Sequence, residues 1–575
     1  MLALGLLLTA CSHSIREKKE EFGKTVNALL EEGFVLEKKE EGAKRSTYLL
    51  RLDKSDKVSG FLLRSATGSS DPRLRRELSD VLKGIRLSLE VNWPLYAKAE
   101  PGSVTAFLLP KDGNGTGELR RLLQEKKIAA DLDFDKEGHL KRVSMRPLDE
   151  KIKNKDKRGR IQIKNTVLKI TRNGKENYDQ AYSFSSALWQ LKMQSPRGEH
   201  LDMGYRDLQC NVDMQSAYYG RRECGVGALS LDMDMLKGQD REKTGFLIKG
   251  MDGKSLVERK NGEVASDGRI TIKQIVLKED TSREKFDFDI ADMEIAGKGE
   301  KIAEETYRRL VDLLAQPPAS EKEAVNKAMS ILGEFFKKMA LGYRITVAKV
   351  KGEMERPVSG KKTDFGLEGL EFGVDWAMAD DFNISKLFKL DSFRIRQTLK
   401  GKPEFEGKLT GFALGIKIEK LYNFMPELMV LAMEKARHPK VKMDSQTRKA
   451  LEELGGRVTR KGVTVVIDPF KIDSLQEKDR QQTKSFDAMD LKLQVDLAPN
   501  KLDPRNPMAP MLALAYLKAE GKATLKKKDL QQILPLLDPG MRMMATRFVK
   551  YEGNRAIFEL RFEQGNLLIN GKPLQ

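Results

Sequence analysis

The chain has 575 residues, of which 33% are charged and 40% hydrophobic, and it carries a net charge of +19 at neutral pH. This length allows two to four domains or one extended architecture. No long apolar segment follows residue 10, which excludes a protein with several membrane-spanning helices. Basic and acidic residues are interspersed almost everywhere, as on a solvated surface.

The first eleven residues, MLALGLLLTAC, resemble the signal end of a bacterial lipoprotein. Leu8-Thr9-Ala10-Cys11 is similar to a lipobox, in which the cysteine receives diacylglycerol and the preceding segment is removed. The apolar run is far shorter than the roughly 20 residues that span a bilayer as a helix. We therefore predict a signal segment at 1–10, lipidation of Cys11, and a location in the bacterial cell envelope, facing the periplasm. Ser12 is not an aspartate-type retention signal, which favours the outer membrane.

The alternative for this segment is the end of an uncleaved anchor whose true start lies upstream. A signal peptide normally begins with basic residues, and here only the amino terminus supplies positive charge. Both interpretations place the bulk of the chain outside the cytoplasm, which argues against nucleic acid as a partner. The lysine-rich stretches at 151–160 and 526–528 are then either solvated segments or contacts with anionic lipid headgroups.

Two further cysteines are predicted to form a disulfide. Cys210 and Cys224 flank a turn-like segment around Tyr219-Gly220-Arg221, so a strand-turn-strand hairpin would bring their sulfur atoms together. A bridge that closes such a loop is worth about 3 kcal/mol in the chain-entropy model. The alternative is a pair of buried free thiols.

The first 150 residues mix helical and strand patterns, as in an α/β unit. After a tether at 11–20, apolar residues fall at helical spacing from Phe22 to Leu30 and the pattern ends at Gly33. Strict alternation from Ile85 to Trp93 predicts a half-buried strand. The other expected elements are strands at 47–52, 61–64, 104–109 and 130–134, and helices from Asp71 and at 119–124.

A repeat is the clearest internal feature. Residues 159–169, GRIQIKNTVLK, recur at 268–278 as GRITIKQIVLK, with eight of eleven positions identical. In both copies isoleucines alternate with polar residues, and a second alternating stretch follows, at 182–191 and 286–295. A hairpin cannot bury one apolar face alone. We therefore predict one long antiparallel sheet that is extended by copies of this hairpin.

The remaining half continues with strands and inserted helices. Helical patterns at 302–315 and 320–339, separated by Pro317-Pro318, predict an antiparallel helical pair in which Ser320 and Glu323 form a capping box. Strands are expected at 343–350, 365–376, 393–399, 405–418, 463–467 and 489–497, helices at 425–436, 445–454, 529–534 and 541–549, and a closing hairpin at 556–563 and 567–569.

The carboxyl end resembles the YdgA-like proteins, a domain-of-unknown-function family of Gram-negative envelopes. The resemblance rests on a strand, LKKKDLQQILPLL, a helix and AIFELRFEQGNLLINGKPL, of which Gly565 to Pro573 is the most recognisable piece. Repeated sheet hairpins with inserted helices are similar to that family over most of the chain. The chain departs from the family at Cys11, because such proteins look anchored by an uncleaved amino-terminal helix. The resemblance implies an envelope location and brings no catalytic residues.

No motif nominates a catalytic residue or a cofactor. The best enzymatic match is to penicillin-binding boxes, with Ser282-Arg283-Glu284-Lys285, Lys243-Thr244-Gly245 and Ser266-Asp267-Gly268. Their order along the chain is reversed, and Ser282 is expected in a turn between strands. The glycine loop at 113–117 lacks the lysine and hydroxyl of a P-loop.

Acidic residues and histidines are also explained without a metal. Aspartates alternate with hydrophobic residues at 131–135, 232–234 and 287–289, which predicts the wet face of a sheet, opposed by lysines on neighbouring strands. The histidines are never at metal-ligand spacing: His13, His139, His200 and His438.

These patterns predict an α+β protein, an extended and curved antiparallel sheet of repeated hairpins with amphipathic helices packed on it. We expect a non-catalytic lipid-anchored envelope protein that meets the membrane through its acyl anchor and binds lipid or another envelope protein along a one-sided sheet. The alternative is an enzyme that acts on an envelope polymer through paired carboxylates. The expected divisions are 1–10 signal, 11–20 tether, 21–150 α/β unit, 151–300 hairpin repeat, 301–340 helical pair and 341–575 β-rich region with helices.

Overall fold

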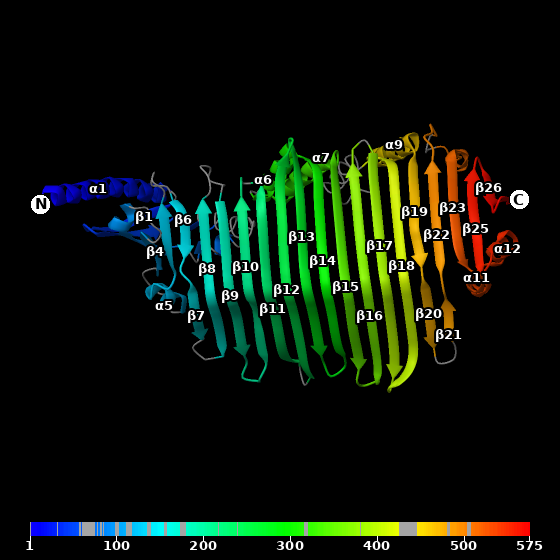
Figure 1. Cartoon of the computed structure of the whole chain (residues 1–575), viewed down its shortest axis with the longest axis horizontal. Helices are drawn as coiled ribbons and strands as arrows, with labels where there is room; N and C mark the ends of the chain where they lie inside the picture. The colour runs from blue at the N-terminus through cyan, green and yellow to red at the C-terminus, as the bar shows by residue number, and fades with distance from the viewer. Residues whose placement is uncertain are drawn as a thin grey trace. The chain divides into compact units, whose positions relative to one another are not determined.

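Antiparallel β-strands joined by hairpin turns make up most of the structure, a computed structural model (Figure 1). This confirms the predicted sheet of many hairpins. The structure describes residues 2–574 except 32, 57–58, 60–74, 78, 81–82, 84, 98–102, 111–117, 135–139, 154–157, 173–179, 217, 238–239, 316–319, 380, 425–444, 480–482, 503–505 and 507. The strand at 61–64, most of the helix from Asp71, the glycine loop at 113–117, the helix at 425–436, His139 and His438 lie outside the described residues.

The chain divides into two units, residues 1–229 with 310–320 and residues 230–309 with 321–575. The first unit opens with helix α1 (Leu2–Glu31), which contains the predicted signal, the predicted tether and the helical pattern from Phe22. Two short helices follow, α4 (Trp93–Ala97) and α5 (Glu118–Gln124). Its strands are β1 (Phe34–Glu41), β2 (Arg45–Leu52), β3 (Arg86–Asn92), β4 (Val104–Leu109), β5 (Ala129–Phe134), β6 (Leu140–Met145), β7 (Leu148–Lys153), β8 (Gly159–Arg172), β9 (Gln180–Gln194) and β10 (His200–Met214).

The aromatic core of the first unit lies beneath α1. Phe22 is fully buried, and its ring centroid lies between 5.3 and 6.0 Å from those of Tyr48, Trp93, Tyr96 and Phe134. The helical spacing therefore predicted the buried side of α1 correctly. Edge-to-face rings of this kind add to the stabilisation that burial of their area provides.

The second unit is a meander of long strands. Strand β11 (Gly220–Lys237) begins in the first unit and ends in the second. The strands of the second unit are β12 (Asp240–Lys260), β13 (Glu263–Asp280), β14 (Lys285–Ala303), β15 (Met339–Arg356), β16 (Lys361–Met378), β17 (Asp381–Leu399), β18 (Lys402–Tyr422), β19 (Val463–Ile472), β20 (Ser474–Asp479), β21 (Thr483–Phe486), β22 (Met489–Leu497), β23 (Leu517–Lys526), β24 (Lys550–Glu552), β25 (Arg555–Glu563), β26 (Asn566–Ile569) and β27 (Lys572–Pro573).

Helices interrupt this meander, and those described overlap predicted helices, except the helix at Ala509–Ala513, which was not predicted. They are α6 (Glu304–Ala315), α7 (Glu321–Phe335), α9 (Ser445–Lys461), α10 (Ala509–Ala513), α11 (Lys527–Ile533) and α12 (Pro539–Phe548), with 3₁₀ turns η1 (Leu514–Tyr516) and η2 (Leu534–Leu536). The closing hairpin of β25 and β26 is also as predicted, with Gln564 and Gly565 both at positive φ in its turn.

The two copies of the repeated sequence form hairpins in the same register. Ile161 pairs with Leu191 in the hairpin of β8 and β9, and Ile270 pairs with Ile295 in the hairpin of β13 and β14. Each first isoleucine of the motif thus meets an apolar residue of the following strand. The prediction of a repeated hairpin is confirmed.

Each unit has a row of residues with positive φ across its strands, which was not predicted. The row of the first unit contains Asn165 and Asp207, and the row of the second contains Gly250, Asp292, Gly369 and Gly411. These residues recur 42 or 43 positions apart, apart from the interval that holds α6 and α7. Glycine, asparagine and aspartate are the residues that tolerate this left-handed conformation.

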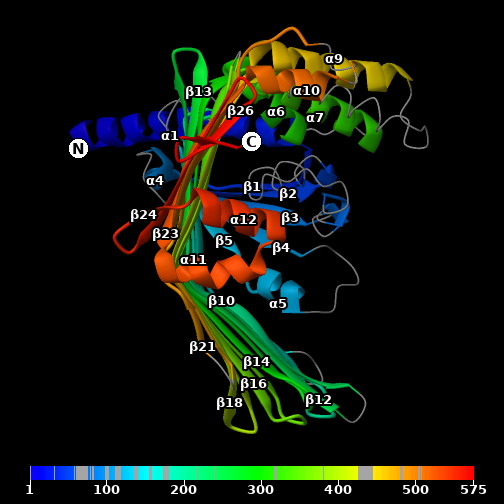
Figure 2. The same cartoon turned by 90° about the vertical axis from the view of Figure 1, so that its right-hand side faces the viewer.

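Strands β12 to β18 of the second unit change the phase of their apolar alternation at its row. In β16, Phe365 and Leu367 precede Gly369, whereas Leu370 and Phe372 follow it. Two residues, instead of the usual one, therefore separate the apolar positions Leu367 and Leu370, as in a β-bulge. Because the neighbouring strands carry the extra residue at the same level, the pairing of β15 with β16 keeps its register across the row. Figure 2 shows the strands of this unit bent partway along their length.

Candidate functional site

Apolar side chains form continuous rows across the second unit, on one face of its strands. On the side of the bend that leads to the turn between β13 and β14, one row crosses nine paired strands without a polar residue. Its members are Ile248, Ile275, Ile290, Val350, Leu367, Phe393, Leu409, Leu475 and Phe486. At 4.7–4.9 Å between neighbouring strands, this row is roughly 38 Å long.

A second apolar row runs beside the first, nearer the ends of the strands. It consists of Phe246, Leu277, Phe288, Gly352, Phe365, Ile395 and Gly407. We call the two rows together the distal apolar patch. Apart from the two glycines, its side chains are half-buried or, for Leu475, 46% exposed. In Figure 2 the described helices of this unit lie beside the other halves of the strands and not beside these ends.

Glycine shapes the surface of the patch. Gly352 lies in the row between Phe288 and Phe365, whose ring centroids are 6.1 Å apart. A Cβ atom at position 352 would lie 2.0 Å from the Cζ atom of Phe365. The absence of a side chain therefore lets the tip of the Phe365 ring lie over the backbone of Gly352.

The opposite face of the same strands is polar, and its charges are paired between strands. Lys278 and Asp287 are 2.8 Å apart, and Lys349 and Glu368 are 3.0 Å apart. Hydrogen bonding to Lys349 lowers the pKa of Glu368. The two faces thus differ sharply, because one offers hydrocarbon and the other is already neutralised by its own ion pairs.

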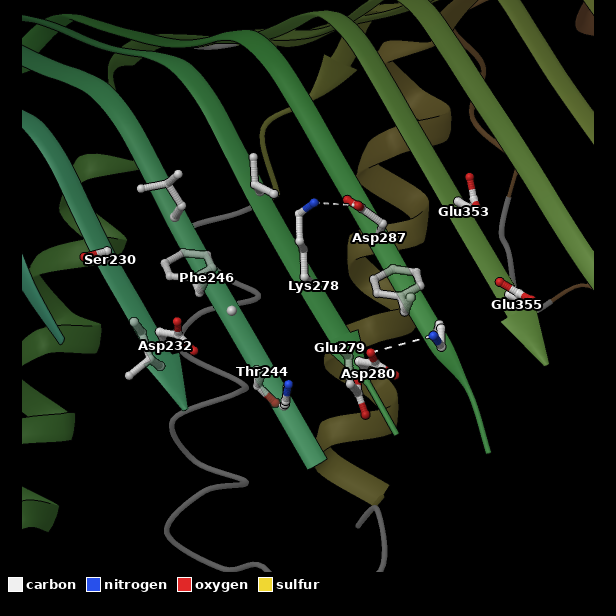
Figure 3. A pocket seen from close by; sticks show the side chains of 17 residues that line it. Ser230, Asp232, Thr244, Phe246, Lys278, Glu279, Asp280, Asp287, Glu353 and Glu355 are labelled. Atoms are coloured by element: carbon white, nitrogen blue, oxygen red, sulfur yellow. Dashed lines mark ion pairs between the residues drawn. The ribbon is translucent and has the colours of Figure 1, made fainter. Parts of the chain in front are cut away.

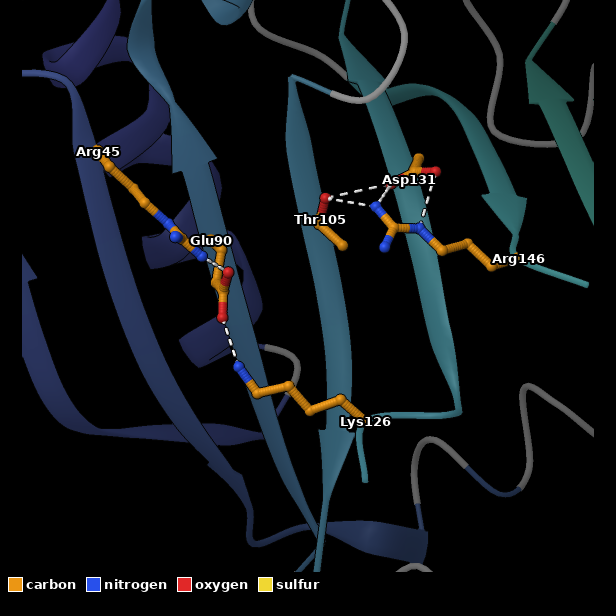
Figure 4. Close-up of polar contacts among 6 residues, drawn as sticks. All are labelled: Arg45, Glu90, Thr105, Lys126, Asp131 and Arg146. Atoms are coloured by element: carbon orange, nitrogen blue, oxygen red, sulfur yellow. Dashed lines mark hydrogen bonds and ion pairs between the residues drawn. The ribbon is translucent and has the colours of Figure 1, made fainter. Parts of the chain in front are cut away.

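The predicted wet faces are only partly confirmed, because Asp133 and Asp234 are buried, at 6% and 3% exposure. Asp131 accepts hydrogen bonds from Arg146 at 2.8 Å and from Thr105 at 3.1 Å (Figure 4). Asp234 lies 2.7 Å from Arg241. The partners include arginine as well as the lysines that were expected. Figure 4 also shows Glu90 between Arg45 and Lys126 in the same unit.

A hollow of about 590 Å³ lies on the polar face at the ends of β11 to β15 (Figure 3). Its carboxylates include Asp287, which pairs with Lys278, and Asp280, whose carboxylate lies 3.8 Å from the Lys285 ammonium. Lys243 of the sequence K-T-G lines the same hollow.

The three penicillin-binding-like boxes do not form one site. Lys243 pairs with Asp280 in the sheet, and Asp280 pairs with Lys285. Ser266, however, lies fourteen residues along β13 from Asp280, which corresponds to roughly 45 Å. Ser282 lies in the turn between β13 and β14, as expected.

Cys210 and Cys224 lie on the two strands of one hairpin, β10 and β11, and their sulfur atoms are 2.25 Å apart. The backbone N–H of Gln215 donates to the carbonyl of Tyr219 at 3.0 Å and closes the connection between the strands. The cysteine pair is therefore at disulfide distance, as predicted. Cys11 lies within α1, and its lipidation stays a prediction.

An uncharged and exposed segment lies near the carboxyl end of the second unit, at α10 and η1. We call residues 508–516 the apolar tip. Its exposed side chains are Met508, Met511, Leu512, Leu514 and Tyr516, each between 41% and 65% exposed. Groups of exposed apolar side chains are typical of surfaces that contact lipid or protein.

Among the described residues, no helix is long and apolar enough to cross a bilayer, and no group of His, Cys, Asp or Glu is arranged to hold a metal ion. Comparison of the chain with protein-family models, with curated proteins and with solved structures finds no match. The candidate site therefore rests on its own geometry.

Proposed function

We propose that the protein is a non-catalytic, lipid-anchored protein of the bacterial cell envelope that binds lipid acyl chains on the distal apolar patch. The observation that carries the proposal is the row of nine apolar residues across nine paired strands. In this proposal, amphipathic helices cover the other part of the same face of a curved sheet, and lipid covers the distal part.

Hydrogen bonding favours hydrocarbon as the occupant. The backbone donors and acceptors of β13 to β17 are paired on both sides within the ladders. The patch therefore offers an occupant only apolar side chains and van der Waals contact. Each methylene group that an acyl chain removes from water there contributes about 0.8 kcal/mol.

The apolar tip is a second feature that favours lipid, rather than protein, as the ligand of the distal apolar patch. Its five exposed side chains suit insertion among lipid headgroups, where amphipathic segments bury their apolar residues. The predicted acyl chain at Cys11 would hold the protein at the same membrane. The resemblance of the carboxyl end to the YdgA-like envelope proteins agrees with that location.

The test of the patch compares two neighbouring substitutions on opposite faces of β18. Leu409→Asp places a charge in the distal apolar patch, whereas Lys408→Asp changes the polar face beside Arg394. Each full-length protein is purified from membranes in mild detergent, and bound phospholipid is quantified by mass spectrometry. We expect lipid with the wild type and Lys408→Asp and a loss of at least fivefold with Leu409→Asp.

A second readout does not depend on purification. A photoactivatable palmitic acid incubated with the wild type should crosslink to peptides that contain residues of the patch. Wild-type protein without bound phospholipid and without such crosslinks would refute the proposal. A co-purifying protein lost only with Leu409→Asp would instead identify the patch as a protein-binding face.

The location is tested separately. We expect wild-type protein expressed with its native upstream region to incorporate labelled fatty acid and to fractionate with membranes. Cys11→Ala should abolish the label and release the protein. Membrane retention without label in both proteins would show that the first residues belong to an uncleaved anchor.

A further inference from the structure

The first unit contains a basic hollow of about 640 Å³ beside β7. It is separate in sequence from the distal apolar patch and plays no part in the proposed function. Five basic side chains line it, from α5 and the turn after it, from β7 and from β8. They are Arg121, Lys127, Lys151, Lys153 and Lys164.

The two carboxylates of the hollow are already satisfied. Glu150 is buried and accepts a hydrogen bond from Arg121 at 3.0 Å, with Lys127 at 3.4 Å. Burial alone would raise the pKa of Glu150, but the hydrogen bonds from Arg121 and Lys127 lower it. Asp149 accepts from the backbone N–H of Asn165 at 2.8 Å.

The remaining lysines have no acidic partner within the described part of the chain. Lys151, Lys153 and Lys164 are exposed and lie on the two paired strands β7 and β8. With five basic and two acidic side chains, the hollow carries a net charge of about +3 at neutral pH. β7 pairs only with β8 among the described residues, so its free edge also presents backbone N–H groups.

We infer that this hollow binds a phosphate group. Three exposed lysines on two adjacent strands line the hollow, together with Arg121 and Lys127, which are held by Glu150. Lysine is a common phosphate ligand and acts as a point charge. The chemistry fits either an anionic lipid headgroup or a soluble phosphate.

The test uses the full-length chain with Cys11→Ala, so that no acyl anchor contributes to membrane binding. Lys151→Gln, Lys153→Gln and Lys164→Gln are combined in one variant. The control variant combines Lys249→Gln, Lys402→Gln and Lys408→Gln, which are exposed lysines of the second unit and remove the same charge. Thermal melting confirms that both variants stay folded.

Two ligands separate the two sources of phosphate. One is a vesicle of phosphatidylcholine with one fifth phosphatidylglycerol, measured by flotation, and the other is inorganic phosphate, measured by calorimetry. Each lysine near an anionic surface contributes about fivefold to affinity, so the triple variant should bind roughly 100-fold more weakly. The control variant should stay within about twofold of the parent.

Loss of vesicle binding alone would assign the site to a lipid headgroup, and loss of phosphate binding would assign it to a soluble anion. If the Lys151, Lys153 and Lys164 variant binds both ligands as well as the control variant does, the inference is wrong. These outcomes do not depend on the distal apolar patch, whose residues are unchanged in all proteins.

Discussion

The bend across the second unit makes a quantitative prediction at Gly369. Its φ is +65°, and a Cβ atom there would lie 2.0 Å from Oδ2 of Asp391 on the neighbouring strand. A left-handed alanine costs about 1–2 kcal/mol. The exposed Asp391 side chain must also leave its position, which adds about 0.5–1.5 kcal/mol if it is forced from its rotamer. We therefore expect Gly369→Ala to lower the free energy of unfolding by about 1.5–3.5 kcal/mol.

Urea unfolding followed by tryptophan fluorescence measures this change, because Trp376 lies on the same strand. Gly553→Ala is the matched control, since Gly553 has a φ of +60° and a Cβ atom there would meet no other atom within 4 Å. Gly553→Ala should lower the free energy of unfolding only by the cost of the left-handed alanine, about 1–2 kcal/mol. Asp391→Ala in the Gly369→Ala background should restore the remainder. Equal midpoints for Gly369→Ala and the wild type would refute the left-handed bend.

Three further predictions concern the first unit. Phe22→Ala removes the centre of the aromatic core and should lower the free energy of unfolding by about 3–5 kcal/mol in urea, whereas exposed Lys24→Ala should change it little. Burial, with the nearby Glu41 carboxylate, raises the pKa of Tyr48 to about 12. The unfolded phenol titrates near 10, so stability should fall as pH rises from 10 to 12, and Tyr48→Phe should lack that fall. Cys210→Ser with Cys224→Ser should lower stability by up to about 3 kcal/mol under oxidising conditions, and a reductant should remove the difference from the wild type.

Local patterns of the sequence predicted most elements well, because each alternation or helical spacing reports directly which side of a strand or helix is buried. Strand β22 at 489–497 has the predicted bounds, and α1 buries the predicted Phe22. Strands were predicted too short where the alternation changes phase. The prediction of 343–350, for example, ends beside the bend, whereas β15 continues to Arg356.

The bend itself was missed because its signal is weak in any one strand. It requires a single glycine, asparagine or aspartate followed by a larger residue, and only the 42- or 43-residue recurrence distinguishes it. The strong repeat at 159–169 and 268–278 pointed elsewhere. The positive φ falls at Asn165 in the first strand of one copy but at Asp292 in the second strand of the other. The two similar segments therefore share the register of their hairpins, but they do not reveal the 42- or 43-residue spacing of the residues with positive φ.

The distal apolar patch was predicted only as a class of surface, a one-sided sheet. Which residues form it depends on register, since a slip of one residue would move every side chain to the other face. The turns and the shared bend fix that register, so that Leu367 meets Phe393 and Phe393 meets Leu409. The exposed apolar tip gives no periodic signal, because α10 is too short to show a face.

Addition of a strand at a sheet edge is an alternative to binding on the apolar face, and the edge strands of the two units argue against it. Strand β1 pairs only with β2 among the described residues, and its exposed side chains include Lys38 and Lys39 in ion pairs with Glu40 and Glu41. Charged edge strands resist pairing with another chain. In the second unit β27 is two residues long and ends in a proline, which has no N–H to donate.

Addition of strands at these edges is therefore disfavoured, and the distal patch carries no comparable protection. A single charged residue among the nine residues of the row would disfavour binding of hydrocarbon to this face. It would remove only a few side-chain contacts between neighbouring strands. None of the nine positions carries one. The edge strands thus carry charge or proline, whereas an apolar row, roughly 38 Å long at 4.7–4.9 Å between strands, stays half-exposed. This contrast supports the proposal that lipid covers that face. This reasoning makes Leu409→Asp the decisive substitution for the function.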